Sequence, residues 1–492
     1  MNILSIAAEC APFAKMGGLA DVVASLTRQW HATGHTATII LPKYASVDVE
    51  RYALEETDLV VGVPVSSWTE YARVWRAKLP GSEADVFFLD NADYFHRDGI
   101  YGDPHGYADN DRRFTFLCRA ACELACMLAV PVDIIHAHDY HAALAIPFVQ
   151  VHYRRHPVFA HTASVYTIHN MAFQGQSDPR RILEFASLRP DNFRGSWFEH
   201  DGVVNLMKTG IMFADKITTV SPTYAQEIRW TRNGEGMQDY LGMRSADLVG
   251  VLNGADYSEW DPETDSYLPS TYSLSVLPEK AAVKNAVLRH SLPKHDDTPD
   301  LPLFGMVSRL TAQKGIDLLE SVLEPLLRTG RMRFMLLGSG DPAMERYFRH
   351  LGSRYPSRAL IRVGYDHALS HSIIAASDFL LVPSLFEPCG LTQLYAMRYG
   401  TVPVVRATGG LRDTVHEYDP HTATGTGFLF ERYTAADFQD AVMRALTVYR
   451  EEPHWTALRT NGMTEDHSSE RCAERYVSVF TWAMERRRTI HS

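Results

Sequence analysis

The stretch MNILSIAAEC at residues 1–10, followed by KMGGLADVV at residues 15–23, has the pattern of a buried strand that leads through a glycine-rich loop into a helix. Glycine lacks a Cβ, so the backbone N–H groups near Gly17 and Gly18 can approach a bound group closely. A helix that starts there directs the positive end of its dipole at the same point. With Lys15 beside them, these features predict an anion site, and phosphate is the expected anion.

The same alternation of strand and helix continues along the chain. Short apolar runs recur in the first half, as in ATIILP, DVFFLD, DIIHAH, SVYTIH and KITTVS, and in the second half, as in LFGMVS, RFMLLG, LIRVG, FLLVP and VPVVR. Such runs are typical of parallel strands that helices cover on both faces. A polar, irregular stretch over residues 256–300 separates the two series.

This order predicts an α/β protein with two Rossmann-like domains, at residues 1–255 and 256–470. Ligands of such folds bind beyond the carboxyl ends of the strands, so two facing domains are expected to enclose a deep cleft. The C-terminal residues 471–492 show a helical apolar stripe and are expected to pack back on the N-terminal domain.

Composition excludes several classes of protein. The 492 residues are 46% apolar and 22% charged, as in a globular enzyme of more than one domain. A net charge of −11 argues against partners such as nucleic acid or an anionic membrane. The sequence has no basic segment before its first apolar run, and no apolar run approaches the ~20 residues of a membrane span. A cytoplasmic protein is expected.

Two loops of the second half carry groups suited to a diphosphate. SRLTAQKG follows a strand and holds Arg309 and Lys314, which could clamp a pyrophosphate or could be solvated surface cations. PSLFEPCGLTQLYAMRYG also follows a strand, and a helix is expected to start near Leu391. Its free N–H groups and the Thr392 hydroxyl suit a phosphate. Glu387 stands beside this anion site. It could act on the positively polarised part of a substrate, or it could be a carboxylate that the nearby helix dipole favours.

Histidines end two strands of the first half, in IHAHDYHAALA and YTIHNMAFQG. Strand alternation places His136 and His138 on one side, and no pair of acidic residues completes a ligand set, so no metal site is expected. His169 and Asn170 suit hydrogen bonds to a polyhydroxylated ligand. The opening loop also lacks the G-x-G-x-x-G pattern, which argues against a dehydrogenase.

Taken together, these motifs resemble those of bacterial glycogen synthases and plant starch synthases. KMGGLADVV, HAHDYHA, TIHNMAFQG, GVLNGAD, VSRLTAQKG, LVPSLFEPCGLTQLYAMRYGT and RATGGLRDTV stand in the order and spacing of that family, over nearly the whole chain. The resemblance implies a GT-B fold and a nucleoside diphosphate glucose donor, commonly ADP-glucose. It implies metal-independent extension of an α-1,4-glucan such as glycogen at its non-reducing end, with retention of configuration.

The resemblance also assigns roles to single residues. His169 corresponds to the histidine that faces the transferred sugar, and Glu387 to the essential carboxylate. Residues on the donor and nucleotide side are Lys15, Gly17, Gly18, Asn253, Arg309, Lys314, Tyr365, Gly390, Leu391 and Thr392. Residues on the acceptor side are Asp21, Asp139, Tyr140 and Asn170. Lys15, Arg309 and Lys314 would stabilise the departing diphosphate, and Glu387 with the His169 carbonyl would face the sugar.

The chain departs from the family pattern at a few positions. Met16 replaces a usual threonine, and Tyr140 replaces a usual tryptophan that lies on the glucan side. Tyr395 stands where many other retaining GT-B enzymes have a second glutamate, as it does in glycogen synthases. No charged catalytic position is replaced.

Two alternatives remain open at the level of sequence, and a third is excluded. The donor could be UDP-glucose, or the chain could be an inactive glucan-binding protein, although the intact charged set argues against the second. A phosphorylase would require a pyridoxal-phosphate lysine in another context, and the sequence has none. Preferred glucan length, regulation and oligomeric state do not follow from the sequence.

Overall fold

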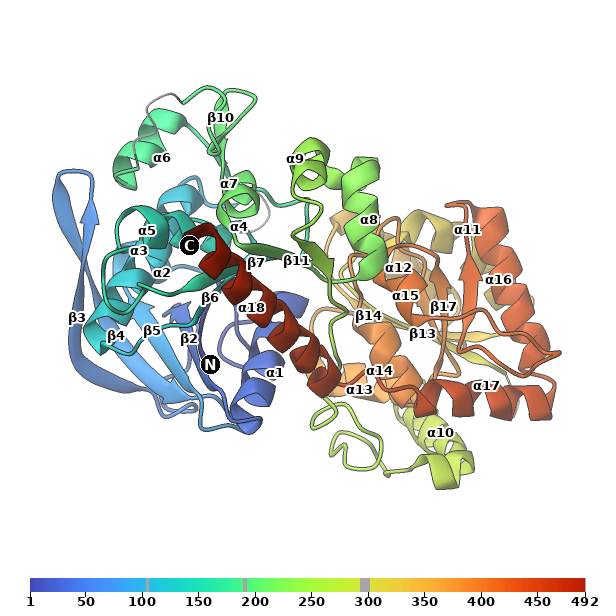
Figure 1. The fold of residues 1–492 in the computed structure, drawn as a ribbon. Helices are drawn as coiled ribbons and strands as arrows, with labels where there is room; N and C mark the ends of the chain where they lie inside the picture. Colours follow the sequence, from blue (N-terminus) through green and yellow to red (C-terminus); the bar gives the residue numbers. More distant parts are fainter. Residues whose placement is uncertain (103–105, 189–192, 293–300, 492) are drawn as a thin grey trace. The chain divides into compact units, whose positions relative to one another are not determined.

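A computed structural model describes residues 1–102, 106–188, 193–292 and 301–491 of the chain (Figure 1). Its packing divides the protein into two compact units, a first unit of Met1–Leu252 with Ser469–Ser492 and a second unit of Asn253–Ser468. The sequence prediction set the boundaries at 255/256 and 470/471, a few residues later. Asn253, expected in the N-terminal domain, is therefore the first residue of the second unit.

A nine-stranded sheet forms the centre of the first unit, with the strand order β12-β11-β7-β6-β1-β2-β5-β4-β3. Its strands are β1 (Asn2–Ile6), β2 (Thr36–Pro42), β3 (Glu55–Val65), β4 (Trp68–Lys78), β5 (Asp85–Asp90), β6 (Ile134–His138), β7 (Ala163–Ile168), β11 (Lys216–Thr219) and β12 (Leu248–Gly250). All pairs are parallel except β3 with β4 and β4 with β5.

The β3–β4 hairpin was not predicted. Its strands alternate between buried and exposed side chains, as expected at a half-solvated sheet edge.

Helices and a small second sheet complete the first unit. The helices are α1 (Gly18–Ala32), α2 (Ala92–Phe95), α3 (Asn110–Leu128), α4 (Asp139–Ala142), α5 (Ala145–Val151), α6 (Pro179–Phe185), α7 (Leu206–Phe213), α8 (Pro222–Trp230), α9 (Gln238–Met243) and α18 (Ser469–His491), with a 3-10 turn at Arg232–Gly234. The small sheet joins β8 (Gln176–Ser177), β10 (Val203–Asn205) and β9 (Glu199–His200).

The C-terminal helix α18 belongs to the first unit, where it lies beside α1 and β7 (Figure 1). Its Tyr476 and Phe480 are fully buried, and the Phe480 ring centroid lies 5.1 Å from that of Trp30 on α1. Trp30 also donates a hydrogen bond from Nε1 to the Ala473 carbonyl, 3.3 Å away. The apolar stripe of α18 thus covers one face of the first sheet.

The second unit has a six-stranded, fully parallel sheet with the order β15-β14-β13-β16-β17-β18. The strands are β13 (Leu303–Val307), β14 (Arg333–Gly338), β15 (Ala359–Val363), β16 (Phe379–Val382), β17 (Val402–Arg406) and β18 (Phe428–Phe430). The helices are α10 (Lys280–Ser291), α11 (Ile316–Arg328), α12 (Pro342–Arg354), α13 (His367–Ala376), α14 (Thr392–Arg398), α15 (Gly409–Thr414), α16 (Ala435–Val448) and α17 (Glu452–Thr464), with 3-10 turns at Leu274–Glu279 and Ala312–Lys314.

Alternate residues of these strands enter two different cores. Phe304 and Phe334 pack with α11, α12 and α16 on one face, whereas Leu303 and Met335 pack with α10 and α13 on the other. Apolar side chains on both faces explain why the strands read as uninterrupted apolar runs. In the described ranges, no helix combines the length and the apolar character that a bilayer crossing needs.

Candidate active site

The loop between β1 and α1 is held from within by a buried carboxylate. Oε2 of Glu9 accepts hydrogen bonds from the backbone N–H groups of Met16, at 2.5 Å, and Gly17, at 3.0 Å. Its Oε1 accepts from the Tyr101 hydroxyl at 2.5 Å, and burial raises the pKa of Glu9. The Gly17 N–H, predicted to face a phosphate, is therefore engaged by Glu9 in this structure. Sequence reasoning missed Glu9, because the residue pattern does not show that its side chain turns back onto the loop, or that Tyr101, 92 residues away, binds it.

The charged and glycine positions of this loop remain at its outer side. Lys15 Nζ lies 2.7 Å from Oδ1 of Asp21, and both side chains are partly exposed. Gly17 precedes α1 in an extended conformation, and a Cβ added to it would meet no atom within 4 Å. Open space beside a helix start and a lysine is what an incoming anion requires. The loop thus combines a fixed inner side with an accessible outer side.

The ends of β6 and β7 are joined through Asp139. This residue has a positive φ of 54°, and its Oδ1 accepts a hydrogen bond of 2.7 Å from the backbone N–H of His169. Burial raises the pKa of Asp139 to about 7 and lowers that of His169 to about 3. The His169 imidazole is therefore neutral near pH 7, and its Nε2 lies 3.0 Å from Nδ1 of His138. Asp139 positions the backbone whose carbonyl was predicted to face the sugar.

A cavity of about 490 Å³ opens beside Tyr140 in the first unit. Its lining mixes aromatic rings with polar groups, and includes Tyr107, Asn110, Asp111, Tyr140, Phe173, Gln174, Gly175 and Glu235. Gly175 has a φ of 64°, and any side chain there would overlap the Tyr140 ring. Such a mixed lining suits a sugar, which presents both hydroxyl groups and apolar C–H faces. Asn170, by contrast, is not among the lining residues.

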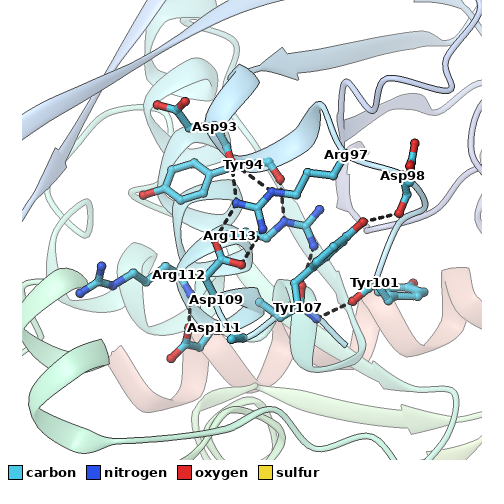
Figure 2. A network of polar contacts seen from close by, with 12 residues as sticks. Asp93, Tyr94, Arg97, Asp98, Tyr101, Tyr107, Asp109, Asp111, Arg112 and Arg113 are labelled. Carbon is cyan, nitrogen blue, oxygen red and sulfur yellow. Dashed lines mark hydrogen bonds and ion pairs between the residues drawn. The ribbon is translucent and has the colours of Figure 1, made fainter. Parts of the chain in front are cut away.

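An arginine network surrounds the segment that carries the lining residues Tyr107, Asn110 and Asp111 of this cavity. Figure 2 shows the polar contacts of this network. Arg113 on α3 is fully buried, and it donates to the Tyr94 carbonyl at 2.6 Å and to Asn110 Oδ1 at 2.5 Å. Arg97 forms a two-pronged ion pair with Asp109, at 2.6 and 2.7 Å. The Tyr107 ring centroid lies 4.9 Å from the Arg113 guanidinium and 5.1 Å from that of Arg97. The polar first turn of α3, with the sequence NDRR, was the available signal in the sequence.

In the second unit, the structure brings Lys314 and Glu387 together. Lys314 Nζ lies 2.6 Å from Glu387 Oε2, and the Ser384 hydroxyl donates to the same oxygen at 2.9 Å. Only 18% of the Lys314 side chain and 8% of the Glu387 side chain are exposed. Gly315, with a φ of 71°, allows the Lys314 turn to approach the Pro383 carbonyl. The two side chains thus hold each other in place, with Glu387 buried and Lys314 partly exposed.

Two glycines place the backbone of the Glu387 loop. Gly409 has a φ of 45°, and a Cβ there would overlap the Glu387 carbonyl. The Gly410 N–H donates to that same carbonyl, at 3.2 Å. Gly390, with a φ of 76°, precedes α14, which begins at Thr392 with Leu391 as its N-cap. The two glycines of the RATGGLRDTV motif thus hold the backbone of Glu387 in place.

Within the part of the chain that the structure describes, no hydrogen bond or ion pair joins Arg309, Tyr365 or Asn253 to this pair. Arg309 is exposed, and Tyr365 is 77% exposed after β15. Asn253 is buried, and within the described ranges its Oδ1 has no hydrogen-bond partner.

Comparison with known proteins identifies the family. Residues 2–243 match the starch synthase catalytic domain, and residues 291–457 match glycosyl transferases group 1. Glycogen synthase 1 of Geobacter sulfurreducens is 42% identical over 491 residues, which cover 99% of this chain and 97% of that protein. The chain belongs to the glycogen and starch synthase family. The glycogen synthase of Koribacter versatilis is also 42% identical, with 98% of each chain covered.

Two solved structures have the same fold as this chain. The catalytic domain of starch synthase IV from Arabidopsis thaliana, bound to ADP and acarbose, has a TM-score of 0.90 and 34% identity, covering 98% of this chain and 99% of that one. Sucrose-phosphate synthase from Thermosynechococcus elongatus has a TM-score of 0.60 at 16% identity, with 98% of each chain covered, and shows the shared fold alone. This glycogen and starch synthase family member is a glycosyltransferase with the GT-B fold, as predicted from its sequence motifs.

Proposed function

We propose that this enzyme transfers glucose from ADP-glucose to the non-reducing end of an α-1,4-glucan such as glycogen, with retention of configuration and release of ADP. The observation that carries the proposal is the Lys314–Glu387 pair, in which a cation lies 2.6 Å from a buried carboxylate at the carboxyl edge of a parallel sheet. Glucosyl transfer from a nucleotide needs both charges, because negative charge develops on the diphosphate while positive charge develops on the sugar.

The reaction exchanges one bond at the glucose C1 atom for another. The bond from C1 to the diphosphate oxygen breaks, and ADP leaves with the electron pair. The acceptor hydroxyl oxygen bonds to C1 from the same face, and its proton passes to the departing phosphate.

We assign Lys15 of the first unit, with Arg309 and Lys314 of the second, to the diphosphate. Glu387 and the His169 carbonyl are assigned to the developing oxocarbenium ion. Asp139 holds the His169 backbone N–H at 2.7 Å, which supports a fixed place for that carbonyl.

The acceptor is proposed to use the cavity beside Tyr140. Aromatic side chains at Tyr107, Tyr140 and Phe173 offer flat surfaces to sugar rings, and Asn110, Gln174 and Glu235 offer hydrogen bonds. Phe173 is 54% exposed, so part of its ring is accessible to a sugar at the cavity. We further propose that the reaction needs no metal ion and takes place in the cytoplasm.

Donor choice is tested by initial rates with ADP-glucose and UDP-glucose, each varied at saturating glycogen. ADP-glucose is expected to give the higher kcat/KM, since the similar starch synthase IV structure is bound to ADP. Equal or higher kcat/KM with UDP-glucose would overturn the proposed donor without affecting the proposed transfer. Absence of glucosyl transfer from either donor would favour a glucan-binding protein without activity.

A further inference from the structure

A cluster of three potential metal ligands lies in the second unit, on residues to which the proposed reaction assigns no role. One ligand atom from each of Glu259, His367 and His371 lies within 4.8 Å of the other two. His367 and His371 stand one turn apart on α13, so they project from the same side of the helix. Glu259 comes from the YSEWDPETD segment, more than a hundred residues earlier in the chain. Two separate segments thus converge on one point.

His371 has the properties of a prepared metal ligand. Its side chain is fully buried, and its Nδ1 lies 2.7 Å from Oδ2 of Asp265. Its Nε2 is also buried, and among the described residues it has no hydrogen-bond partner. When Nδ1 carries the proton and donates it to Asp265, Nε2 carries a lone pair. A carboxylate that holds the far nitrogen of an imidazole is the usual support of a metal-bound histidine.

Packing fixes the orientation of the His371 ring. Trp260 stacks on it with a centroid distance of 3.7 Å and an angle of 10°, and Tyr395 stacks on the other side of Trp260 at 4.0 Å. Asp265 is fixed as well, because it accepts a hydrogen bond of 2.6 Å from the Tyr399 hydroxyl. The His371 ring therefore cannot rotate to give Nε2 a different hydrogen-bond partner. Nε2 keeps its place without a partner among the described residues.

The other two members can adjust to an ion. His367 Nε2 lies 3.0 Å from Glu259 Oε1, and 29% and 40% of these side chains are exposed. A tetrahedral ion with bonds of about 2.0–2.1 Å requires ligand atoms roughly 3.4 Å apart. Atoms that already lie within 4.8 Å need only a small movement of the two exposed side chains.

We propose that Glu259, His367 and His371 bind a divalent transition metal ion, with zinc as the best fit. Two imidazole nitrogens and one carboxylate oxygen form a ligand set that zinc accepts, with water in the fourth position. Mg²⁺ and Ca²⁺ prefer oxygen ligands alone, so this set disfavours them. The ion would tie the first turn of α13 to the 256–268 segment and stabilise the second unit. It is independent of the proposed transfer reaction, which assigns no step to a metal.

Zinc binding by the full chain tests the proposal. The protein is treated with a chelator, dialysed, and titrated with Zn²⁺ by calorimetry, and the melting temperature Tm is measured with and without Zn²⁺. The test variant is the double substitution Glu259→Gln with His367→Gln, whose positions are exposed enough to keep the fold. His350→Gln, an exposed histidine on α12, is the matched control among the 22 histidines of the chain.

Wild-type protein and the His350→Gln control are expected to bind one more Zn²⁺ ion than the double variant, with at least tenfold higher affinity for that ion. Zn²⁺ is expected to raise the Tm of the first two and to leave that of the double variant unchanged. Co²⁺ in the wild-type site should give the visible absorption of a four-coordinate nitrogen and oxygen complex. Equal Zn²⁺ stoichiometry and an equal Tm response in wild type and the double variant would overturn the proposal.

Discussion

The Nζ atom of Lys314 lies 2.6 Å from Oε2 of Glu387, although the two residues are 73 positions apart in the chain. Lys314 ends a 3-10 turn that follows β13, and Glu387 lies on the loop that follows β16. These strands are neighbours in the second sheet, so their carboxyl ends carry the two loops to one edge. Because Glu387 is buried, loss of the lysine leaves its carboxylate without a charged partner.

Glu387→Gln is expected to lower kcat by several orders of magnitude with only a modest change in donor KM. The amide keeps the size of the side chain but cannot stabilise positive charge on the sugar in the transition state. Steady-state kinetics with ADP-glucose check this, and Glu320→Gln, an exposed position on α11, is the control. A near-normal kcat in a folded Glu387→Gln protein would show that the carboxylate is only structural.

Lys15→Gln is expected to raise donor KM and to lower kcat by about 10²–10³, the usual cost of losing one preorganised stabiliser of transition-state charge. Acceptor KM should change little, because the lysine is assigned to the diphosphate. Lys78→Gln, at an exposed ion pair of β4, serves as the control for loss of one positive charge. If the Lys15→Gln variant keeps the donor KM and kcat of the wild type, the KMGG segment is an ordinary turn without a role in phosphate binding.

Gly17→Ala separates ligand approach from folding. A Cβ at this position meets no atom within 4 Å, and the backbone is extended, so the variant should keep the Tm of the wild type. If phosphate approaches the loop closely, the added methyl group lies in its path and donor KM should rise at least several-fold. A wild-type donor KM in this variant would contradict that approach. Calorimetry and kinetics on the same preparation give both readouts.

Asp139 predicts a specific pH dependence of stability. Burial raises its pKa to about 7 in the folded protein, above the ordinary value of 3.8. Its contribution to stability is therefore complete below pH 3.8 and is lost as the pH rises through 7. Asp139→Asn removes this titration and still offers an oxygen to the His169 N–H. Urea unfolding at pH 5 and pH 8 should show that the wild type loses more stability over this range than the variant. Parallel pH profiles would contradict the raised pKa.

Treatment with a chelator is expected to leave glucosyl transfer unchanged, because lysine and arginine side chains take the charge-stabilising role that a divalent ion has in other transferases. The measurement is the initial rate before and after dialysis against a chelator, with Mg²⁺ and Mn²⁺ added back. Loss of activity that either ion restores would refute a metal-independent reaction. Loss of the Zn²⁺ ion proposed for α13 should be visible in Tm alone.

Several features could be read directly from the sequence. The apolar strand runs and the loops that follow them predicted two parallel sheets and the sheet edges at which Lys15, Arg309 and Glu387 lie. Periodicity is a local property, and parallel sheets place all loops of one kind at one edge, so the position of these loops followed from it, whereas the strand order did not. The apolar stripe of α18 was likewise visible as residues at helical spacing.

Only the tertiary structure decided which of these groups meet. Tyr101 binds Glu9, and Asp139 holds the His169 N–H group, because hydrogen bonds form between atoms that the fold brings together from distant segments. The same holds for the approach of His367 to Glu259. The β3–β4 hairpin escaped prediction because its half-exposed strands lack the continuous apolar run of the buried ones. Sequence spacing records which chemical groups are available, whereas packing decides which partner each of them finds.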